Sequence, residues 1–298
     1  MDDRLTISVE LVQRLIADQF PQFSLLAIEP VVPGGWNNRS FRLGSEMIIR
    51  MPSAQRYEQQ VEKEQRFLPL LAPHLPLPIT EPVGMGCADH SYPFSWGIYR
   101  WIDGETPLPT WIANSEQFAV DLGEFLRTLH GLDGANGPLA GPHNFYRGGL
   151  LATYDEETRT TITKLGTNID TSRATALWDQ ALASHWQRPP VWLHGDIAPG
   201  NLLVKNDRLS AVIDFGSCGT GDPACDLAIA WTMMDSVAAK VFRTTLGHDE
   251  ATWDRARGWA LWKTLITLQK QIETRETGAT ETQAMLDRIL GSDFHGNH

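Results

Sequence analysis

The stretch of sequence that most constrains the fold runs from residue 191 to residue 216 and reads VWLHGDIAPGNLLVKNDRLSAVIDFG. Apolar runs bounded by polar residues and glycine are typical of short β-strands. Three such runs occur here, at 191–193, 202–204 and 209–213. A polar turn at 205–208 joins the second run to the third, so these two strands are predicted to pair as a hairpin.

Three polar side chains flank these predicted strands. Asn201 comes directly before the first hairpin strand and Asp214 directly after the second, so the open end of the hairpin would make them neighbours. Asp196 lies on the loop that leads to the same end. Each residue alone is also a common turn former. Together they supply the oxygen ligands that Mg²⁺ takes beside phosphates, and a carboxylate to orient an attacking hydroxyl, so the spacing indicates a magnesium-nucleotide site.

The composition limits the classes of partner. The chain has 298 residues, 42% of them hydrophobic, and a net charge of −11. This acidic balance argues against nucleic acid or an anionic membrane as the main partner. It is compatible with a cationic substrate, and it is equally ordinary for a soluble enzyme without one. Because no signal peptide or spanning helix is visible and the three cysteines form no disulfide or metal pattern, we expect a cytoplasmic protein; its oligomeric state stays open.

Taken together, the motifs resemble a known family. The HGD sequence at 194–196, the later Asn201 and the DFG sequence at 214–216 are similar to the Brenner-type motif and the metal-binding Asp of the aminoglycoside phosphotransferase family. That family is the small-molecule branch of the protein-kinase-like fold, whose protein kinases carry a related catalytic loop. The GDPACDLA sequence at 221–228 also matches the family pattern, and the resemblance extends from Gly34 to the end of the chain.

The resemblance implies an α+β, bilobal protein-kinase-like fold, with an N-terminal antiparallel sheet lobe and a mostly helical C-terminal lobe. We expect residues 1–102 to form the nucleotide-binding lobe and residues 103–298 to hold the catalytic loop and a helical substrate-binding region. Asp196 would be the catalytic residue. Asn201 and Asp214 would hold Mg²⁺, and ATP or GTP would be the co-substrate.

The nucleotide is expected to lie against the N-terminal sheet. Residues 31–51 predict strand, glycine-rich turn, strand, turn and strand, and by resemblance the first turn covers the phosphates. Gly34 and Gly35 would let the backbone approach the phosphates, and Ser40 would donate to them, although such glycines are as often a simple turn. Backbone groups around Tyr99 to Trp101 would face the adenine.

Arg50 and Glu64 are expected to align the phosphates. Kinase-like enzymes usually carry Lys at the strand position of Arg50. Arginine is always charged and binds phosphate as a fork, so the role can survive with a different geometry. A helix predicted at 56–72 places Glu64 on its apolar face, where a carboxylate needs a charged partner. Arg50 is the expected partner, and a Glu64 that bends out to solvent is the alternative.

Other residues are given supporting roles. By resemblance, Asp226 braces the catalytic loop through His194. His130 ends a helix predicted at 114–131, and we interpret it as a helix-end residue. An acidic cluster is interpreted as a helix start, where acids interact favourably with the helix dipole; alternatively it belongs to a substrate-binding insert that receives amines. The cluster consists of Asp155, Glu156 and Glu157.

The sequence therefore predicts a small-molecule O-phosphotransferase, a kinase that moves the γ-phosphate of a magnesium nucleotide to a hydroxyl group. The acceptor would be an aminoglycoside-like antibiotic, which implies antibiotic resistance, or alternatively a macrolide, a sugar or another metabolite. Two other functions stay open. One is a catalytically silent kinase-like nucleotide-binding protein, which Arg50 would suit. The other is a metal-dependent hydrolase, which needs further ligands near Asp196, where only His194 qualifies.

Overall fold

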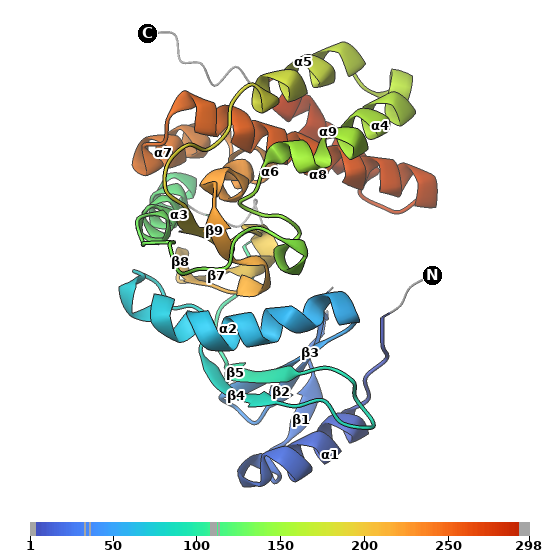
Figure 1. Cartoon of the computed structure of the whole chain (residues 1–298), viewed down its shortest axis with the longest axis vertical. Coiled ribbons are helices and arrows are strands. Elements are labelled where there is room, and N and C mark those ends of the chain that lie inside the picture. Colours follow the sequence, from blue (N-terminus) through green and yellow to red (C-terminus); the bar gives the residue numbers. More distant parts are fainter. Residues whose placement is uncertain (1–3, 33, 36, 108–111, 113, 292–298) are drawn as a thin grey trace.

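The protein has two lobes, as shown by a computed structural model that describes residues 4–32, 34–35, 37–107, 112 and 114–291 (Figure 1). The N-terminal lobe holds a five-stranded antiparallel sheet in the order β1-β2-β3-β5-β4. Its strands are β1 (Ile28–Pro30), β2 (Asn38–Leu43), β3 (Met47–Pro52), β4 (Pro82–Gly86) and β5 (Trp96–Arg100). The C-terminal lobe is mostly helical. The predicted fold class is therefore confirmed.

The β2–β3 hairpin decides which side chains face the other lobe. Its register pairs Ser40 with Arg50 and Phe41 with Ile49. Residues directly opposite one another project from the same face of a sheet, and neighbours in sequence project from opposite faces. Phe41 and Ile49 are buried in the core of the N-terminal lobe. Ser40 and Arg50 therefore share the other face of the sheet.

Two helices cover the two faces of this sheet (Figure 1). α1 (Val9–Gln19) begins after Ser8, whose hydroxyl accepts the Leu11 N–H and caps the helix. Its buried stripe joins the sheet core on the face of Phe41. α2 (Glu58–Leu71) lies between the sheet and the C-terminal lobe. The helices expected at 8–20 and 56–72 are thus present, each shorter by one or two residues at either end.

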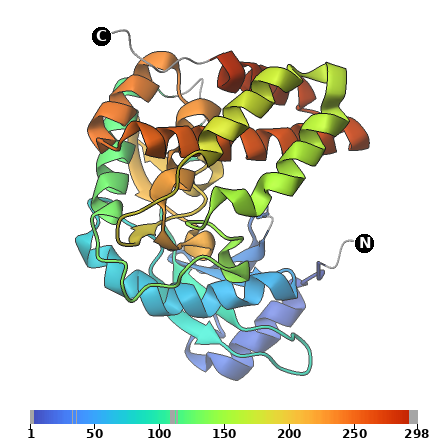
Figure 2. The same ribbon diagram turned by 45° about the horizontal axis from the view of Figure 1, so that its top comes forward.

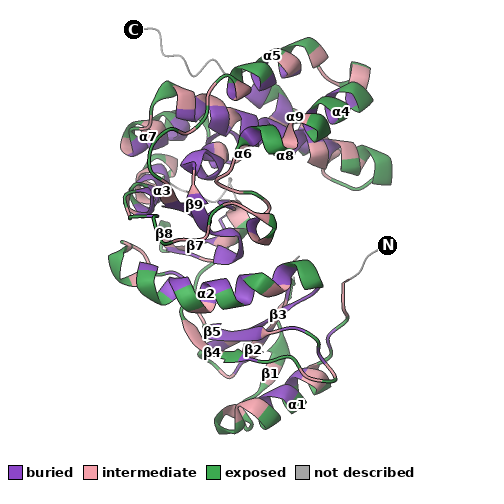
Figure 3. Cartoon of the chain, viewed as in Figure 1, coloured by how far each residue is buried: buried purple, intermediate pink, exposed green. Residues whose placement is uncertain are grey.

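Buried residues occur in both lobes (Figure 3). The buried apolar side chains form two separate clusters, one centred in each lobe. The smaller cluster joins α1 to the sheet. The larger one fills the C-terminal lobe and includes Phe67, Leu68 and Leu71 from the end of α2. Because α2 contributes to the core of the other lobe, it is fixed to the elements that carry the loop of residues 194–201. The lobe boundary after residue 102 stays a prediction.

The C-terminal lobe is a set of helices crossed by the long α8 (Figure 2). They are α3 (Ser115–His130), α4 (Asp155–Leu165), α5 (Thr171–Leu182), α6 (Ile229–Thr232), α7 (Ser236–Leu246), α8 (Glu250–Thr274) and α9 (Ala279–Gly291). Side-chain oxygens of Asn114, Asp170, Asp235 and Asp249 accept N–H groups in the first turns of α3, α5, α7 and α8. Such caps satisfy N–H groups that have no partner within the helix. Among the described residues, no helix combines the length and apolarity needed to cross a bilayer.

Four short strands support the loop of residues 194–201. β7 (Leu202–Lys205) and β8 (Arg208–Val212) pair as the predicted hairpin, and its turn places Asn206 and Asp207 at φ of 53° and 59°. These residue types tolerate the left-handed conformation that a tight hairpin turn requires. β6 (Val191–Leu193) is the third predicted strand, and it pairs with β9 (Gly219–Gly221). β9 was not predicted, because Gly219-Thr220-Gly221 has no apolar run to mark it.

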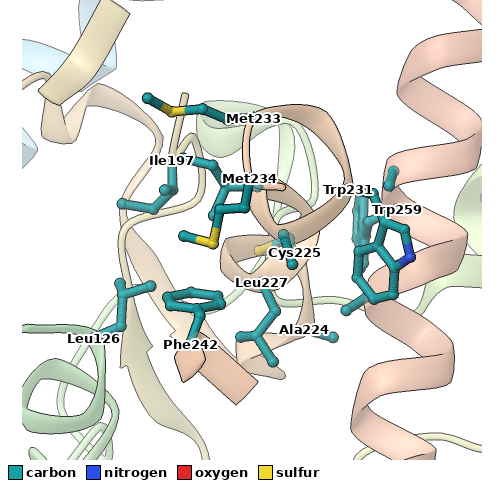
Figure 4. Packing of buried hydrophobic residues seen from close by; sticks show 14 of the residues in the cluster. Leu126, Ile197, Ala224, Cys225, Leu227, Trp231, Met233, Met234, Phe242 and Trp259 are labelled. Carbon is teal, nitrogen blue, oxygen red and sulfur yellow. The ribbon is translucent and has the colours of Figure 1, made fainter. Parts of the chain in front are cut away.

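The loop between β6 and β7 is also fixed by apolar contacts. Ile197, the residue after Asp196, belongs to the same buried cluster as Met234 and Phe242 (Figure 4). A buried apolar side chain of this size stabilises its position by about 1.5–3 kcal/mol. Asp196 is therefore held at the edge of a packed core.

Candidate active site

The loop after β6 is held by the buried carboxylate of Asp226. One oxygen accepts the His194 N–H at 2.8 Å, and the other accepts the Gly195 N–H at 2.7 Å. Gly195 has a φ of 84°, and a Cβ there would lie 2.3 Å from the Ser217 carbonyl oxygen, so the loop requires glycine. Burial raises the pKa of Asp226, but the hydrogen bond from His130 and the other charged and polar contacts outweigh it. The pKa lies below its usual value, and the carboxylate is charged.

The His194 ring links this loop to Ile213, the residue before Asp214. Its Nδ1 accepts the Asp196 N–H at 3.1 Å, so the ring proton lies on Nε2, which donates to the Ile213 carbonyl at 2.9 Å. Asp226 does not contact the His194 ring in these bonds. It instead contacts Nε2 of His130 at 3.1 Å. Asp226 was expected to brace the loop through His194. It instead contacts backbone N–H groups of the loop and the His130 ring.

His130 is more than the helix-end residue that the sequence suggested. It is buried at the end of α3, and its Nδ1 lies 3.1 Å from Nε2 of His248. With Asp226 it forms a chain of three side chains from the loop to the part-buried His248. The only signal in the sequence was its position at the end of an apolar stripe.

Asn201 is oriented by Asp196. Its Nδ2 donates to the Asp196 carbonyl at 2.8 Å and to Asp196 Oδ2 at 3.2 Å. Both bonds use the amide nitrogen, so Oδ1 is the atom of Asn201 left to bind a ligand. The Ile213 N–H donates to the Asn201 carbonyl at 2.9 Å, which brings Asp214, the next residue, to the same place. The hairpin argument thus brings the three polar residues together.

A buried ion-pair cluster joins the sheet, α2 and the segment that begins at Asp214. Arg50 Nη1 donates to Glu64 Oε1 at 2.9 Å, and Nη2 donates to Asp214 Oδ1. The Tyr99 hydroxyl donates to the other oxygen of Glu64 at 2.8 Å. Arg50 and Glu64 are 8% and 2% exposed, so the alternative in which Glu64 bends out to solvent is wrong. The pairing of Arg50 with Glu64 is present as expected.

Charge balance within this cluster keeps Asp214 ionised. Burial raises the pKa of Asp214, but the charge and hydrogen bond of Arg50 outweigh burial, and the pKa lies below its usual value. Burial raises the pKa of Glu64, which Arg50 and Tyr99 offset only in part. Asp214 has a φ of 62°, a left-handed conformation that is uncommon outside glycine and is found where a site imposes it.

The glycine turn precedes β2. Gly34 and Gly35 are exposed, and Arg39 Nη1 donates to the Gly35 carbonyl at 3.1 Å, which fixes the turn. Ser40 projects from the same face of the sheet as Arg50, because the two residues pair across the hairpin. Ser40 therefore lies on the same side of the sheet as the ion-pair cluster.

The segment from Tyr99 to Trp101, which was expected to face the adenine, has fewer unpaired hydrogen-bonding groups than the sequence suggested. The Tyr99 side chain points to Glu64, as described above. The Arg100 and Trp101 N–H groups donate at 2.8 Å to the carbonyls of Glu81 and Glu46. The two N–H groups are thus already used within the protein, so a base at this segment would have to use its other backbone groups.

The acidic cluster lies in the first turn of α4, as the helix-start interpretation expected. Asp155 accepts the Trp178 Nε1–H at 2.7 Å and pairs with Arg159, while Glu156 is exposed. Glu157 accepts the Trp262 Nε1–H at 2.7 Å. Two of the three acids are therefore tied to tryptophans of neighbouring helices, and Glu157 is the one joined to α8.

Two cationic residues near Asp196 were missed. Arg147 Nε donates at 3.0 Å to the carbonyl of Gly195, the residue before Asp196. Lys263 follows Trp262 on α8. No local pattern marks either residue, because both lie far from the motif along the chain.

The oxygen donors fit a magnesium ion carried by phosphates. Asp214 supplies a charged carboxylate and Asn201 an uncommitted amide oxygen, and Mg²⁺ is commonly held by one or two such protein oxygens beside phosphate. Within the described residues, no group of three or more His, Cys, Asp or Glu side chains is placed to hold a metal. His194, the one extra ligand a hydrolase could have used, has both ring nitrogens engaged with backbone groups.

Comparisons with known proteins agree with this geometry. The model of the phosphotransferase enzyme family matches residues 30–259. A mutant of aminoglycoside 2'-phosphotransferase-IIIa, solved as its GDP complex, is 20% identical with a TM-score of 0.74, covering 95% of this chain and 97% of that one.

Two further solved structures have the same fold. A thermostable mutant of aminoglycoside phosphotransferase APH(4)-Ia, in ternary complex with AMP-PNP and hygromycin B, is 18% identical with a TM-score of 0.64, covering 96% and 99% of the two chains. Macrolide 2'-phosphotransferase MphH from Brachybacterium faecium is 20% identical with a TM-score of 0.60, covering 96% and 99%. A comparison with curated proteins finds no match. The family match spans most of the chain, and the protein therefore belongs to the phosphotransferase enzyme family.

Proposed function

We propose that the protein transfers the γ-phosphoryl group of a magnesium nucleotide to a hydroxyl of a small molecule. The observation that carries this proposal is the convergence of Asp196, Asn201 and Asp214 beside the Arg50–Glu64 pair. Phosphoryl transfer requires positioning and charge stabilisation, and these groups supply both.

Asp196 would accept the proton of the acceptor hydroxyl, or orient that hydroxyl toward the phosphorus. Its carboxylate is held by Asn201 and by the braced loop, so it is already in place before the acceptor binds. Asn201 Oδ1 and Asp214 would hold Mg²⁺. When bound, the ion would neutralise charge on the nucleotide phosphates.

Arg50 would bind the phosphates from the sheet side, with Glu64 and Tyr99 fixing its guanidinium. Gly34, Gly35 and Ser40 would cover the phosphates with backbone and hydroxyl donors. The adenine or guanine would lie against the segment that follows Tyr99, including Trp101. Related structures hold GDP, ATP and ADP, so both ATP and GTP are proposed co-substrates.

The proposed acceptors follow the fold neighbours, which include complexes of enzymes with kanamycin, gentamicin and hygromycin B and a macrolide 2'-phosphotransferase. An aminoglycoside-like antibiotic, a macrolide, a sugar or another metabolite all carry suitable hydroxyls. We propose a cytoplasmic enzyme, which the free thiols of Cys87, Cys218 and Cys225 suit. A catalytically silent nucleotide-binding protein is the second candidate. It would be favoured by the loss of a residue of the cluster, and Asp196, Asn201 and Asp214 are all present.

The test is consumption of ATP and of GTP with Mg²⁺ across a panel of hydroxyl acceptors, for the wild type and for Asp196→Asn. General-base catalysis contributes roughly 10²- to 10⁴-fold, so the variant should lose at least 100-fold in kcat. Its magnesium-nucleotide affinity should stay close to that of the wild type. Asp207→Asn, at the exposed turn of the hairpin, is the matched control. Equal turnover by Asp196→Asn would refute the assignment, and tight nucleotide binding without any turnover would favour the silent protein.

A further inference from the structure

Gln60 differs from the other buried polar side chains of α2. It is 2% exposed, and neither Oε1 nor Nε2 of its carboxamide has a hydrogen-bond partner among the residues that the structure describes. The other two, Lys63 and Glu64, are paired. Lys63 Nζ donates to Nδ1 of His143 at 3.1 Å, and Arg50 donates to Glu64. Because a buried polar group without a partner costs free energy, the carboxamide of Gln60 calls for an explanation.

The Gln60 carboxamide lies beside Asp214. A Cβ built on Gly216 would lie 2.7 Å from Gln60 Oε1 and 3.3 Å from Asp214 Oδ1, so the two oxygens flank the same point. The terminal torsion of a glutamine side chain is roughly two-fold, and a half-turn about it exchanges Oε1 and Nε2. After such a half-turn, the carboxamide offers an N–H donor on the side of Asp214 Oδ1.

Arg50 is the donor that Asp214 Oδ1 has in the structure. Its Nη2 binds this oxygen, while Nη1 binds Glu64. The proposed function requires Arg50 to bind the nucleotide phosphates, and a guanidinium that turns toward them while Nη1 stays on Glu64 withdraws Nη2 from Asp214. A buried carboxylate oxygen that loses its donor is unfavourable unless another donor replaces it. Gln60 is the unpaired carboxamide next to that oxygen.

We infer that Gln60 is a positioning residue for Asp214, an assignment that rests on the proposed function and adds a residue to its site. When the magnesium nucleotide binds, Arg50 turns from Asp214 Oδ1 to the phosphates, and Gln60 Nε2 takes its place as the hydrogen-bond donor. Gln60 acts through Asp214 and touches no substrate. Carboxylates that hold a metal are themselves held by hydrogen bonds, and loss of such a partner lowers metal affinity or activity by about 10- to 100-fold.

Gln60→Met tests this role, because methionine has a similar length and lacks both polar atoms. The affinity for a non-hydrolysable nucleotide is measured by calorimetry, once with Mg²⁺ and once with a chelator. With Mg²⁺, the variant should bind the nucleotide about 10- to 100-fold more weakly than the wild type. With the chelator, Asp214 holds no ion, so the variant and the wild type should bind alike. Gln59→Met, at the exposed neighbouring position of α2, is the matched control and should bind like the wild type in both conditions.

Urea denaturation without nucleotide or Mg²⁺ separates this role from a structural one. A carboxamide that held the fold together would make Gln60→Met less stable than the wild type. Replacing buried polar atoms that have no partner with an apolar group of similar shape does not cost stability. The urea midpoint of Gln60→Met should therefore equal or exceed that of the wild type, while its affinity for the magnesium nucleotide falls.

Three results would overturn the assignment of Gln60. They are an unchanged affinity of Gln60→Met for the magnesium nucleotide, an equal loss of affinity with the chelator, and a lower urea midpoint, which includes a variant that does not fold. Failure of the proposed function is seen separately, in the wild type. If the wild type binds no magnesium nucleotide, the proposed function fails. If the wild type and Gln60→Met bind it equally well, the proposed function stands and only the role of Gln60 is wrong.

Discussion

Acidification should destabilise the fold through His248, the outer member of the chain that begins at Asp226. His248 Nε2 lies 3.1 Å from His130 Nδ1, and His130 Nε2 contacts Asp226. Burial lowers the pKa of His248 to about 4, and the neighbouring His130 lowers it as well. An imidazole held neutral in the fold can gain a proton more easily in the unfolded chain, so lower pH favours unfolding.

The size of the effect follows from the two pKa values of His248, 6.5 in the unfolded chain and about 4 in the folded protein. Because the folded pKa is the lower one, this contribution to stability is complete above pH 6.5 and is lost as the pH falls toward 4. At pH 5 the unfolded chain binds almost one proton more at this site than the folded protein. The free energy of unfolding should therefore be about 2 kcal/mol lower at pH 5 than at pH 7.5 from His248 alone.

Urea denaturation at pH 7.5 and pH 5 measures this loss. His248→Gln removes the titrating group, so the variant should lose about 2 kcal/mol less than the wild type between the two pH values. His185→Gln, which changes an exposed histidine, is the matched control and should keep the wild-type dependence. If His248→Gln lost as much stability as the wild type on acidification, the burial argument for His248 would be refuted.

Four other changes should have measurable effects. Asp226→Ala leaves two backbone N–H groups and His130 without their buried acceptor. The free energy of unfolding, measured in urea, should therefore fall by about 3–5 kcal/mol. An unchanged value would argue that Asp226 does not hold the loop after β6. Tyr99→Phe removes one hydrogen bond to Glu64 and should lower the free energy of unfolding by about 1 kcal/mol in the same measurement. No loss of stability would mean that the hydroxyl does not hold Glu64. Removing Mg²⁺ with a chelator should weaken nucleotide binding, measured by calorimetry. In an Asp214→Ala variant the chelator should cause no further loss of nucleotide affinity. A large additional loss of affinity in the variant would mean that other residues hold the ion. Arg50→Lys keeps one charge but not the fork, so its nucleotide KM should rise, and an equal KM would show that the fork is dispensable.

The sequence predicted which residues of the candidate site would lie together because local patterns determine these contacts. A hairpin necessarily brings together the residues at its open end, so Asn201 and Asp214 could be placed from the strand pattern alone. The same holds for Glu64, whose position on the apolar face of a helix required a buried partner. These relations depend on helix and strand periodicity, which a single sequence carries.

The remaining features depend on contacts between distant elements. His130 is 96 residues from Asp226 along the chain, and nothing in the helix pattern indicates where its ring ends. Arg147 reaches the loop across 48 residues, from a segment without regular structure. β9 exists because β6 offers it a partner, and not because its own residues favour a strand. In each case tertiary packing supplies the information that local patterns lack.

The arginine at position 50 illustrates how a departure from a family pattern can be explained once the partners are known. A lysine ammonium is a compact charge, whereas a guanidinium presents separate donors in one plane. Arg50 uses this difference, because Nη1 binds Glu64 on α2 while Nη2 binds Asp214 after β8. One side chain thus ties the sheet, the helix and the segment that begins at Asp214 together. In a single sequence the substitution could equally suggest a lost activity. The geometry instead shows a cationic residue that keeps Asp214 ionised, and we propose that the same residue aligns the phosphates.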